Sequence, residues 1–280
     1  MALSERESLR HAAQSRNGRL MSTLQYLIRE KLHSAPILKL FEGDVFYNGA
    51  PVFDVPLVVM LFCNRSGSNL AAQYLLNTGL VGGLQESTNH ASVAFAKKKY
   101  NASSYGELFE AQARDVIDRG RWYGIKASPN QLAMLKKWGL LSLFPSVKIL
   151  NSTRKDVVGQ AVSLSIAMQT QKWTSQADVP DVEVGYDFQD ITGHINRICT
   201  QAAASHMVAA ALSTPMHELV YEDVVEDPIG AIRGAVRFMG FPDGDLDIGE
   251  PKIQKQADEK NDLFIKMYGE ELLGRIVKSV

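Results

Sequence analysis

The sequence predicts an α/β protein with three layers, in which helices flank a central parallel sheet. Two segments lead to this fold class: residues 57–78 and 147–173 each read as a strand, a short polar turn and a helix. Further strand-like and helical segments alternate after them. Strands joined by helical crossovers run parallel, and ligands of such sheets bind beyond the carboxyl ends of the strands. The turns after the two strands are therefore the expected site.

The first 55 residues are expected to form an N-terminal extension, and residues 56–280 the main domain. A helix is predicted from about Glu5 to Lys31. Tyr47-Asn-Gly-Ala-Pro51 is typical of a turn that closes a hairpin.

The next element is an apolar strand, Leu57 to Cys63, which runs into the small, glycine-containing loop Asn64-Arg-Ser-Gly-Ser-Asn69 and then a helix. Backbone N–H groups of such a loop, together with the helix N-terminus, can bind a phosphate-like anion, although a strand, a small-residue turn and a helix cap also meet ordinary structural needs. The loop has neither the G-x-x-x-x-G-K-[ST] pattern of ATPases and GTPases nor the dinucleotide fingerprint G-x-G-x-x-G. Its basic residue, Arg65, precedes the glycine and can make a forked contact with a tetrahedral anion.

The second strand ends in the turn Asn151-Ser-Thr-Arg154, and an amphipathic helix follows. Arg154 and Ser163, two helical turns apart, can converge on one phosphate, although a solvated helix cap is the simpler reading of the arginine alone. The following apolar residues recur at helical spacing and are expected to face the sheet: Val157, Ala161, Leu164 and Met168.

The remaining predicted elements are a strand at 122–127, a helix at 187–213, a strand at 217–221 and a helix at 228–239. Residues 174–186 have no clear period and are predicted to be a loop over the acceptor side of the site. Tyr221-Glu222-Asp223 is expected to end a buried strand and cap the next helix, a structural role.

Taken together, the two anion-binding segments resemble the sulfotransferases that use 3′-phosphoadenosine 5′-phosphosulfate (PAPS), and most of all the bacterial trehalose 2-sulfotransferase branch. The resemblance spans about residues 56 to 270. Its marks in the first part of the chain are Arg65-Ser-Gly-Ser68, Gln85-Glu86, Gly124-Ile-Lys126, Gln160-Ala-Val-Ser163 and Gln169-Thr-Gln171-Lys-Trp173. The C-terminal marks are Leu219-Val-Tyr221-Glu222-Asp223, Phe238-Met-Gly240 and Gln256-Ala-Asp258.

The resemblance implies the P-loop-like sulfotransferase fold, PAPS as donor, 3′,5′-adenosine bisphosphate (PAP) as product, and sulfuryl transfer to a hydroxyl of a carbohydrate, glycolipid or other small molecule. In such a reaction the protein accelerates transfer mainly by positioning the donor and the acceptor and by stabilising the negative charge that develops. The residues expected to hold the donor are Arg65, Ser66, Gly67, Ser68, Asn69, Arg154 and Ser163. Arg65 is also expected to act in catalysis by stabilising charge.

Glu86 is the expected general base, as the glutamate at this position is in the resembling family, and Gln171 and Trp173 are expected to line the acceptor cleft. From the residues alone, a surface glutamate that caps the next segment is the preferred interpretation of Glu86. For Trp173, filling core space near a helix end is as good an interpretation as lining the cleft. His90 is the second candidate for the base. The chain departs from the family at Asn64, usually proline, and at Pro129-Asn130, where an aromatic residue is usual. These departures affect the acceptor side more than the nucleotide side.

Composition narrows the function classes. A formal net charge of −1 gives no general attraction to nucleic acid or to an anionic membrane. The start of the chain lacks a signal-peptide pattern and no run reaches the ~18 apolar residues of a membrane span, so a cytoplasmic location is expected. The two cysteines, Cys63 and Cys199, are too few for a disulfide framework, and Cys63 suits a buried strand end. No Cys/His cluster has metal-ligand spacing, so no metal is expected.

Two other function classes stay open. A kinase or NTPase would share the fold but should carry a phosphate-loop lysine and a magnesium carboxylate in the usual setting, which this loop lacks. A non-catalytic nucleotide-binding module would show the same site without turnover. The acceptor cannot be identified from the sequence, and the oligomeric state stays open, with a homodimer among the options.

Overall fold

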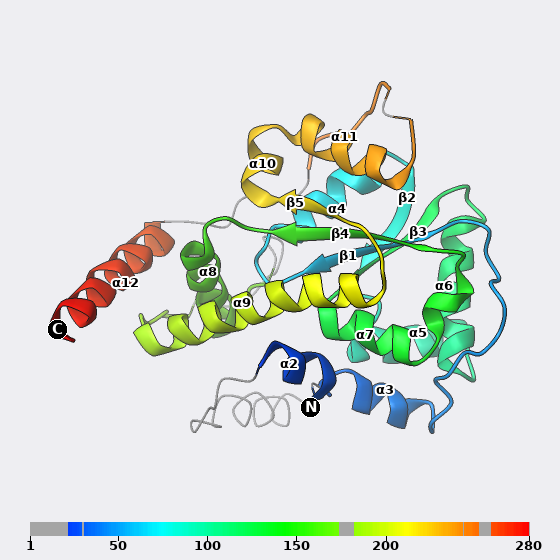
Figure 1. The fold of residues 1–280 in the computed structure, drawn as a ribbon, viewed down its shortest axis with the longest axis horizontal. Coiled ribbons are helices and arrows are strands. Elements are labelled where there is room, and N and C mark those ends of the chain that lie inside the picture. The colour runs from blue at the N-terminus through cyan, green and yellow to red at the C-terminus, as the bar shows by residue number, and fades with distance from the viewer. Residues whose placement is uncertain (1–21, 30, 174–181, 243, 252–258, 280) are drawn as a thin grey trace.

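A computed structural model describes residues 22–29, 31–173, 182–242, 244–251 and 259–279. Its centre is a parallel five-stranded sheet with the order β2-β3-β1-β4-β5 (Figure 1). The strands are β1 (Leu57–Phe62), β2 (Val81–Gln85), β3 (Trp122–Ala127), β4 (Val147–Thr153) and β5 (Met216–Val220). The predicted α/β class with a parallel sheet is confirmed.

Helices cover both faces of the sheet (Figure 1), which confirms the three layers. On one face lie α4 (Ser68–Asn77), α10 (Tyr221–Glu226) and α11 (Pro228–Met239). On the other lie α5 (His90–Tyr100), α6 (Tyr105–Ile117), α7 (Pro129–Lys137), the short 3₁₀ helix η1 (Leu140–Leu143) and the C-terminal half of α9 (Phe188–Ala211).

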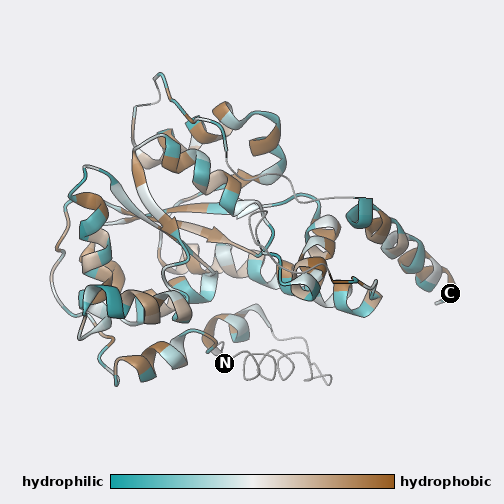
Figure 2. Ribbon diagram, turned by 180° about the vertical axis from the view of Figure 1, so that it is seen from behind, coloured by the Kyte–Doolittle hydropathy of each residue, from teal (hydrophilic) through white to brown (hydrophobic). Residues whose placement is uncertain are grey.

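The central strand β1 is buried along its whole length. Its side chains alternate between the two cores: Val58 and Met60 pack with α4 and α11, whereas Val59 and Leu61 pack with α6 and α7. A strand covered on both faces requires a continuous apolar run, which is the pattern that made this strand recognisable from sequence. Apolar residues accordingly concentrate around the central strands (Figure 2).

Beyond the carboxyl ends of β1 and β4, α8 (Val157–Thr170) packs with α9 and α12 (Glu259–Lys278) (Figure 1). The expectation that the apolar positions of α8 face the sheet is wrong. Ala161 instead packs in a third cluster with Ile191 of α9 and Phe264 of α12, and Met168 is 36% exposed. Helical spacing identifies an apolar face but does not say which element covers it.

The N-terminal residues lie against the main body through α2 (Thr23–Arg29) and α3 (Ser34–Leu40). α2 falls within the helix predicted at 5–31, of which residues 5–21 lie outside the described residues. The predicted hairpin at 47–51 is wrong, because residues 41–56 contain no strand. The N–H of Tyr47 bonds instead to the carbonyl oxygen of Trp138 at 2.8 Å, so the chain runs along the end of α7.

The predicted strand at 122–127 and helix at 228–239 match β3 and α11, and the predicted elements at 187–213 and 217–221 are found as α9 and β5. Strand β2 was not predicted. It is an edge strand that contains Gly82 and Gly83, which weaken a strand pattern, and its pairing shifts between Gly83 and Gln85. No helix in the described part of the chain is long and apolar enough to span a membrane.

Candidate active site

The loop between β1 and α4 has the backbone shape of an anion site. Arg65 and Gly67 both have positive φ, +65° and +85°, and Gly67 is the N-cap of α4, with no side chain capping the helix. A Cβ at Gly67 would overlap the ring of Tyr221. The first N–H groups of α4, at Ser68 and Asn69, therefore lie at a helix end that favours negative charge.

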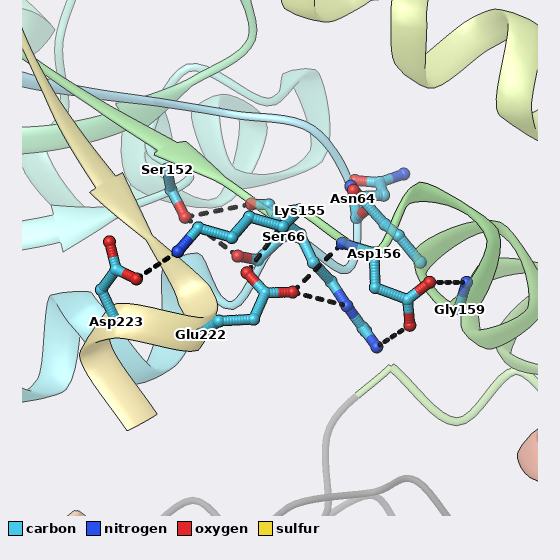
Figure 3. Close-up of polar contacts among 10 residues, drawn as sticks. Asn64, Ser66, Ser152, Lys155, Asp156, Gly159, Glu222 and Asp223 are labelled. Atoms are coloured by element: carbon cyan, nitrogen blue, oxygen red, sulfur yellow. Dashed lines mark hydrogen bonds and ion pairs between the residues drawn. The ribbon is translucent and has the colours of Figure 1, made fainter. Parts of the chain in front are cut away.

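Hydrogen bonds from β4 and α8 stabilise the loop between β1 and α4. The Ser152 hydroxyl donates to the carbonyl oxygen of Ser66 at 3.2 Å and lies 3.1 Å from the Ser66 hydroxyl (Figure 3). Because Ser152 has one hydrogen to give, the Ser66 hydroxyl donates in return. The Ser66 N–H bonds to the carbonyl oxygen of Cys63 at 3.2 Å, so in this structure both donors of Ser66 stabilise the loop itself. Gln160, which is buried, donates to the carbonyl oxygen of Asn64 at 2.8 Å.

Arg65 extends from this loop to α8. Its Nε donates to the Ser163 hydroxyl at 2.9 Å, and its Nη1 donates to the carbonyl oxygen of Trp173 at 3.0 Å. Burial lowers the pKa of Arg65, and the nearby charge of Arg154 lowers it further. Arg65, Arg154 and Ser163 therefore form one cluster, although Ser163 bonds to Arg65 here.

Arg154 lies in the turn between β4 and α8. Its Nη2 donates to Asp156 at 3.2 Å, and its guanidinium lies 5.2 Å from the centre of the Tyr221 ring. Its Nε is buried without a hydrogen bond, since the nearest carboxylate oxygen, on Glu222, is 3.9 Å away. Glu222 accepts instead from the backbone N–H groups of Lys155 and Asp156, at 3.0 and 3.2 Å (Figure 3). Glu222 thus shapes the turn between β4 and α8, which is a structural role. The prediction that residues 221–223 end a strand and cap the next helix is wrong, because they form the first turn of α10 and Asp227 caps α11.

Glu86 follows β2 directly, and Lys126 lies near the end of the neighbouring strand β3. The Lys126 ammonium is 3.5 Å from a carboxylate oxygen of Glu86 and bonds to the side-chain oxygen of Asn69 in the first turn of α4. Lys126 is 4% exposed, whereas the Glu86 side chain is 47% exposed. Burial lowers the pKa of Lys126, and the Glu86 carboxylate opposes that shift.

Residues 58–271 match the family model of the Stf0 sulphotransferases, which is more than half of the chain. The chain belongs to the Stf0 sulphotransferase family. It is a sulfotransferase that takes its sulfuryl group from PAPS and passes it to a small-molecule acceptor. A search of curated proteins gave no match.

Solved sulfotransferases resemble this sulfotransferase in structure at low sequence identity. One from Alicyclobacillus acidocaldarius has 12% identity and a TM-score of 0.45, with 78% of this chain and 93% of that chain covered. STF1 from Mycobacterium tuberculosis H37Rv has 13% identity and a TM-score of 0.41, with 85% and 79% covered. Mouse SULT7A1 complexed with PAP has 10% identity and a TM-score of 0.43, with 85% and 71% covered.

The other predicted residues of the sulfotransferase lie as follows. The side chain of Gln171 bonds to the carbonyl oxygen of Met168 at 2.7 Å, at the end of its own helix. Trp173 is 42% exposed, which contradicts the alternative that it fills the core. His90 begins α5, and its Nδ1 lies 3.0 Å from Nδ1 of His33, so it faces the N-terminal segment.

Sequence reasoning gave no role to Lys126, Ser152 or Gln160, all of which are buried at the site. Two signals were available. Lys126 and Gln160 both stand in motifs of the family resemblance, and a lysine among the apolar residues of a predicted strand is seldom buried without a partner. The partners of the serine and the glutamine are backbone carbonyl groups, which leave no trace in a sequence pattern.

The residues present fit the donor. Two partly buried guanidiniums of like charge lie beside a helix N-terminus, and the Nε of Arg154 is buried without a hydrogen bond, an arrangement that phosphate groups would stabilise. Among the described residues, no group of three or more His, Cys, Asp or Glu side chains is placed to hold a metal ion.

Proposed function

We propose that this sulfotransferase acts on a hydroxyl group of a carbohydrate, a glycolipid or another small molecule, with Glu86 as the general base. The observation that carries the proposal is the pair formed by exposed Glu86 and buried Lys126 beside Asn69 of α4, because it places a proton acceptor and a cation next to the anion loop. The residues proposed to hold the donor are Arg65, Ser66, Gly67, Ser68, Asn69, Arg154 and Ser163.

PAPS supplies an activated sulfuryl group when bound. The protein then has three tasks. Glu86, half exposed, accepts the proton of the acceptor hydroxyl. Lys126 donates hydrogen bonds to oxygens that gain negative charge, and its burial makes each bond stronger than it would be in water. Arg65 and the N-terminus of α4 stabilise the negative charge on the departing phosphate.

On the donor side, the two arginines support sites for two phosphate groups. Arg65 belongs to the loop that begins α4 and Arg154 to the turn that begins α8, so they approach from neighbouring strand ends. We propose that the loop holds the 5′-phosphosulfate, and that Arg154 with Ser163 holds the 3′-phosphate. Binding of the phosphates would satisfy the buried Nε of Arg154.

On the acceptor side, we propose that Gln171 and Trp173 contact the acceptor. An exposed indole ring offers a flat apolar surface, which suits the C–H face of a sugar ring.

The donor site is tested by calorimetric titration with PAP, with ATP and 5′-AMP as comparators. We expect a strong preference for PAP that Arg154→Ala largely removes, because the 3′-phosphate loses its guanidinium. Arg119→Ala is the matched control, because Arg119 is exposed in the turn after α6. This variant should bind PAP as tightly as the unaltered protein does. A preference for ATP with magnesium would contradict the proposal.

The base is tested by incubating the protein with PAPS and a panel of sugars, glycolipids and other alcohols, with product detected by mass spectrometry as gain of one SO₃ group. With an acceptor so identified, Glu86→Gln should lower turnover by about 10²- to 10⁴-fold and leave PAP affinity unchanged. Glu110→Gln is the control, because Glu110 pairs with Arg114 on the surface of α6. Equal turnover in both variants would exclude Glu86 as the base.

A further inference from the structure

The N-terminal segment, residues 22–40, reaches the carboxyl edge of the sheet through Tyr26 of α2. Tyr26 is buried, and its hydroxyl donates to the side-chain oxygen of Asn130 at 3.0 Å and accepts from the side chain of Gln201 in α9 at 3.1 Å. Asn130 belongs to the first turn of α7, three residues after the end of β3. Tyr26 therefore fixes α2 beside the end of the strand that carries Lys126.

The same segment reaches the chain that follows β2 through His33, which lies between α2 and α3. Nδ1 of His33 accepts a hydrogen bond from the backbone N–H of His90 at 3.3 Å and lies 3.0 Å from Nδ1 of His90. His90 is the first residue of α5, four positions after Glu86. Because α2 packs on α7 and α9 while α3 packs on α5, the segment spans the helices that follow β2 and β3 (Figure 1).

The segment thus contacts both stretches of chain that lead away from the Glu86–Lys126 pair, four residues beyond each member. We propose that residues 22–40 form part of the acceptor side of the active site and help to determine which acceptors bind, with Tyr26 and His33 as the positioning residues. The inference rests on the proposed function, because it takes the Glu86–Lys126 pair as the place where the acceptor hydroxyl reacts.

The position of the segment in the chain suits a role in acceptor choice. The family model covers residues 58–271, so residues 22–40 lie outside it. A donor that is shared by a family needs a shared site, whereas acceptors that differ need surfaces that differ. An element from outside the family match can supply such a surface and leave the donor site as it is.

The hydroxyl of Tyr26 joins the turn after β3 to α9. The Ser128 hydroxyl also donates to the side-chain oxygen of Asn130, so this oxygen accepts one bond from its own turn and one from α2. Gln201 is buried as well. Loss of the Tyr26 hydroxyl takes away the acceptor of the Gln201 amide, and a buried donor without a partner is costly. We expect α2 to shift until that cost falls, which moves the surface that the acceptor contacts.

The test compares Tyr26→Phe with Tyr47→Phe as the matched control. Both changes remove one hydroxyl from the N-terminal 55 residues. Tyr47 donates to the carbonyl oxygen of Ala50 and lies at the end of α7, where its N–H bonds to Trp138. PAP affinity is measured by calorimetry. Values of kcat and KM are measured for the acceptor that reacts fastest in the panel of sugars, glycolipids and other alcohols, and relative rates for the whole panel.

We expect Tyr26→Phe to raise the acceptor KM several-fold and to change the order of rates in the panel, with kcat nearly unchanged. This combination is the mark of lost acceptor binding rather than lost catalysis. PAP affinity should stay the same, because Asn130 and Gln201 are not among the residues proposed to hold the donor. Tyr47→Phe should behave as the unaltered protein. His33→Ala breaks the other contact and should raise the same KM, so the inference stays testable if Tyr26→Phe does not fold.

The outcomes are distinct. If the folded variants at Tyr26 and His33 lower only the free energy of unfolding in urea and keep the acceptor KM and the order of rates, the segment is structural and the inference is overturned, while the proposed function stands. An equal rise of KM in Tyr47→Phe would also overturn it, because any loosening of the N-terminal residues would then suffice. Failure of the unaltered protein to bind PAP, or to transfer to any member of the panel, would overturn the proposed function and this inference together.

Discussion

Replacing Lys126 by methionine should separate stability from activity. The Lys126 ammonium lies 3.5 Å from a carboxylate oxygen of Glu86. The lysine is 4% exposed, whereas the glutamate side chain is 47% exposed. At this separation the attraction is about 1 kcal/mol at the dielectric constant of water and about 5 kcal/mol at an effective value of 20. Solvent around Glu86 screens the pair toward the smaller value, whereas burying an ammonium costs several kcal/mol.

The pair therefore costs more than it contributes. In Lys126→Met the thioether chain packs on Phe62, whose ring lies 4.8 Å from the ammonium in the unaltered protein, and Glu86 remains hydrated. We expect the free energy of unfolding at neutral pH to stay the same or rise by about 1–3 kcal/mol. Turnover should fall by roughly 10²- to 10³-fold, the usual effect of losing one donor to developing negative charge.

The assays are urea denaturation and the rate of PAP formation from PAPS with an identified acceptor. The pKa of Lys126 is lowered in the folded protein, so between that pKa and the ordinary value of 10.5 the unfolded chain binds more protons. The stability of the unaltered protein should therefore rise with pH in this window, and the advantage of Lys126→Met should shrink there. Lys148→Met is the matched control, since Lys148 lies 5.6 Å from the Phe238 ring at the opposite end of β4 from the site. Lower stability of Lys126→Met with turnover retained would refute the reasoning.

Three further predictions concern the loop and the two cysteine thiols. Gly67→Ala should weaken PAP binding in calorimetry, because alanine is strained at φ +85° and its Cβ would displace Tyr221. If this variant binds PAP as tightly as the unaltered protein, the shape of the loop is not needed for binding. With a thiol reagent, exposed Cys199 should react within the mixing time and buried Cys63 only on unfolding, so that Cys199→Ser shows no fast reaction. Burial raises the pKa of Cys63 to about 12, so the unfolded chain loses the thiol proton at lower pH than the folded protein does. Cys63 should therefore make the free energy of unfolding fall as the pH rises above about 9. In urea denaturation, Cys63→Ala should lack this part of the fall.

Sequence patterns predicted the elements whose burial is regular. β1 is a continuous apolar run, and β3 is apolar apart from Gly124 and Lys126; both were found within a residue of their predicted bounds. Helix α11 begins with Pro228, at a position where proline favours a helix start. Edge strand β2, with two glycines, has no such pattern. Its shift in pairing at Gly83 places Glu86 beside Lys126, and no sequence rule gives the register of a strand that was not expected.

The covering of a helix is a tertiary property. The apolar spacing of α8 was real, yet the elements that cover it, α9 and α12, lie at least 18 residues further along the chain. Which neighbour covers an apolar face depends on the path of the whole chain, so the local pattern could not distinguish the sheet from other helices.

Local order in the sequence was enough to predict the α/β class, the two strand-turn-helix units and the family, because each depends on a short pattern: an apolar run, a glycine that must adopt positive φ, an arginine at a strand end. The tertiary structure alone decided that Arg65 bonds to Ser163 and Trp173 and that Lys126 lies between Asn69 and Glu86. These contacts join residues 40 to 108 positions apart in the chain. Parallel strand pairing brings them together, because it gathers the carboxyl ends of all five strands at one edge of the sheet.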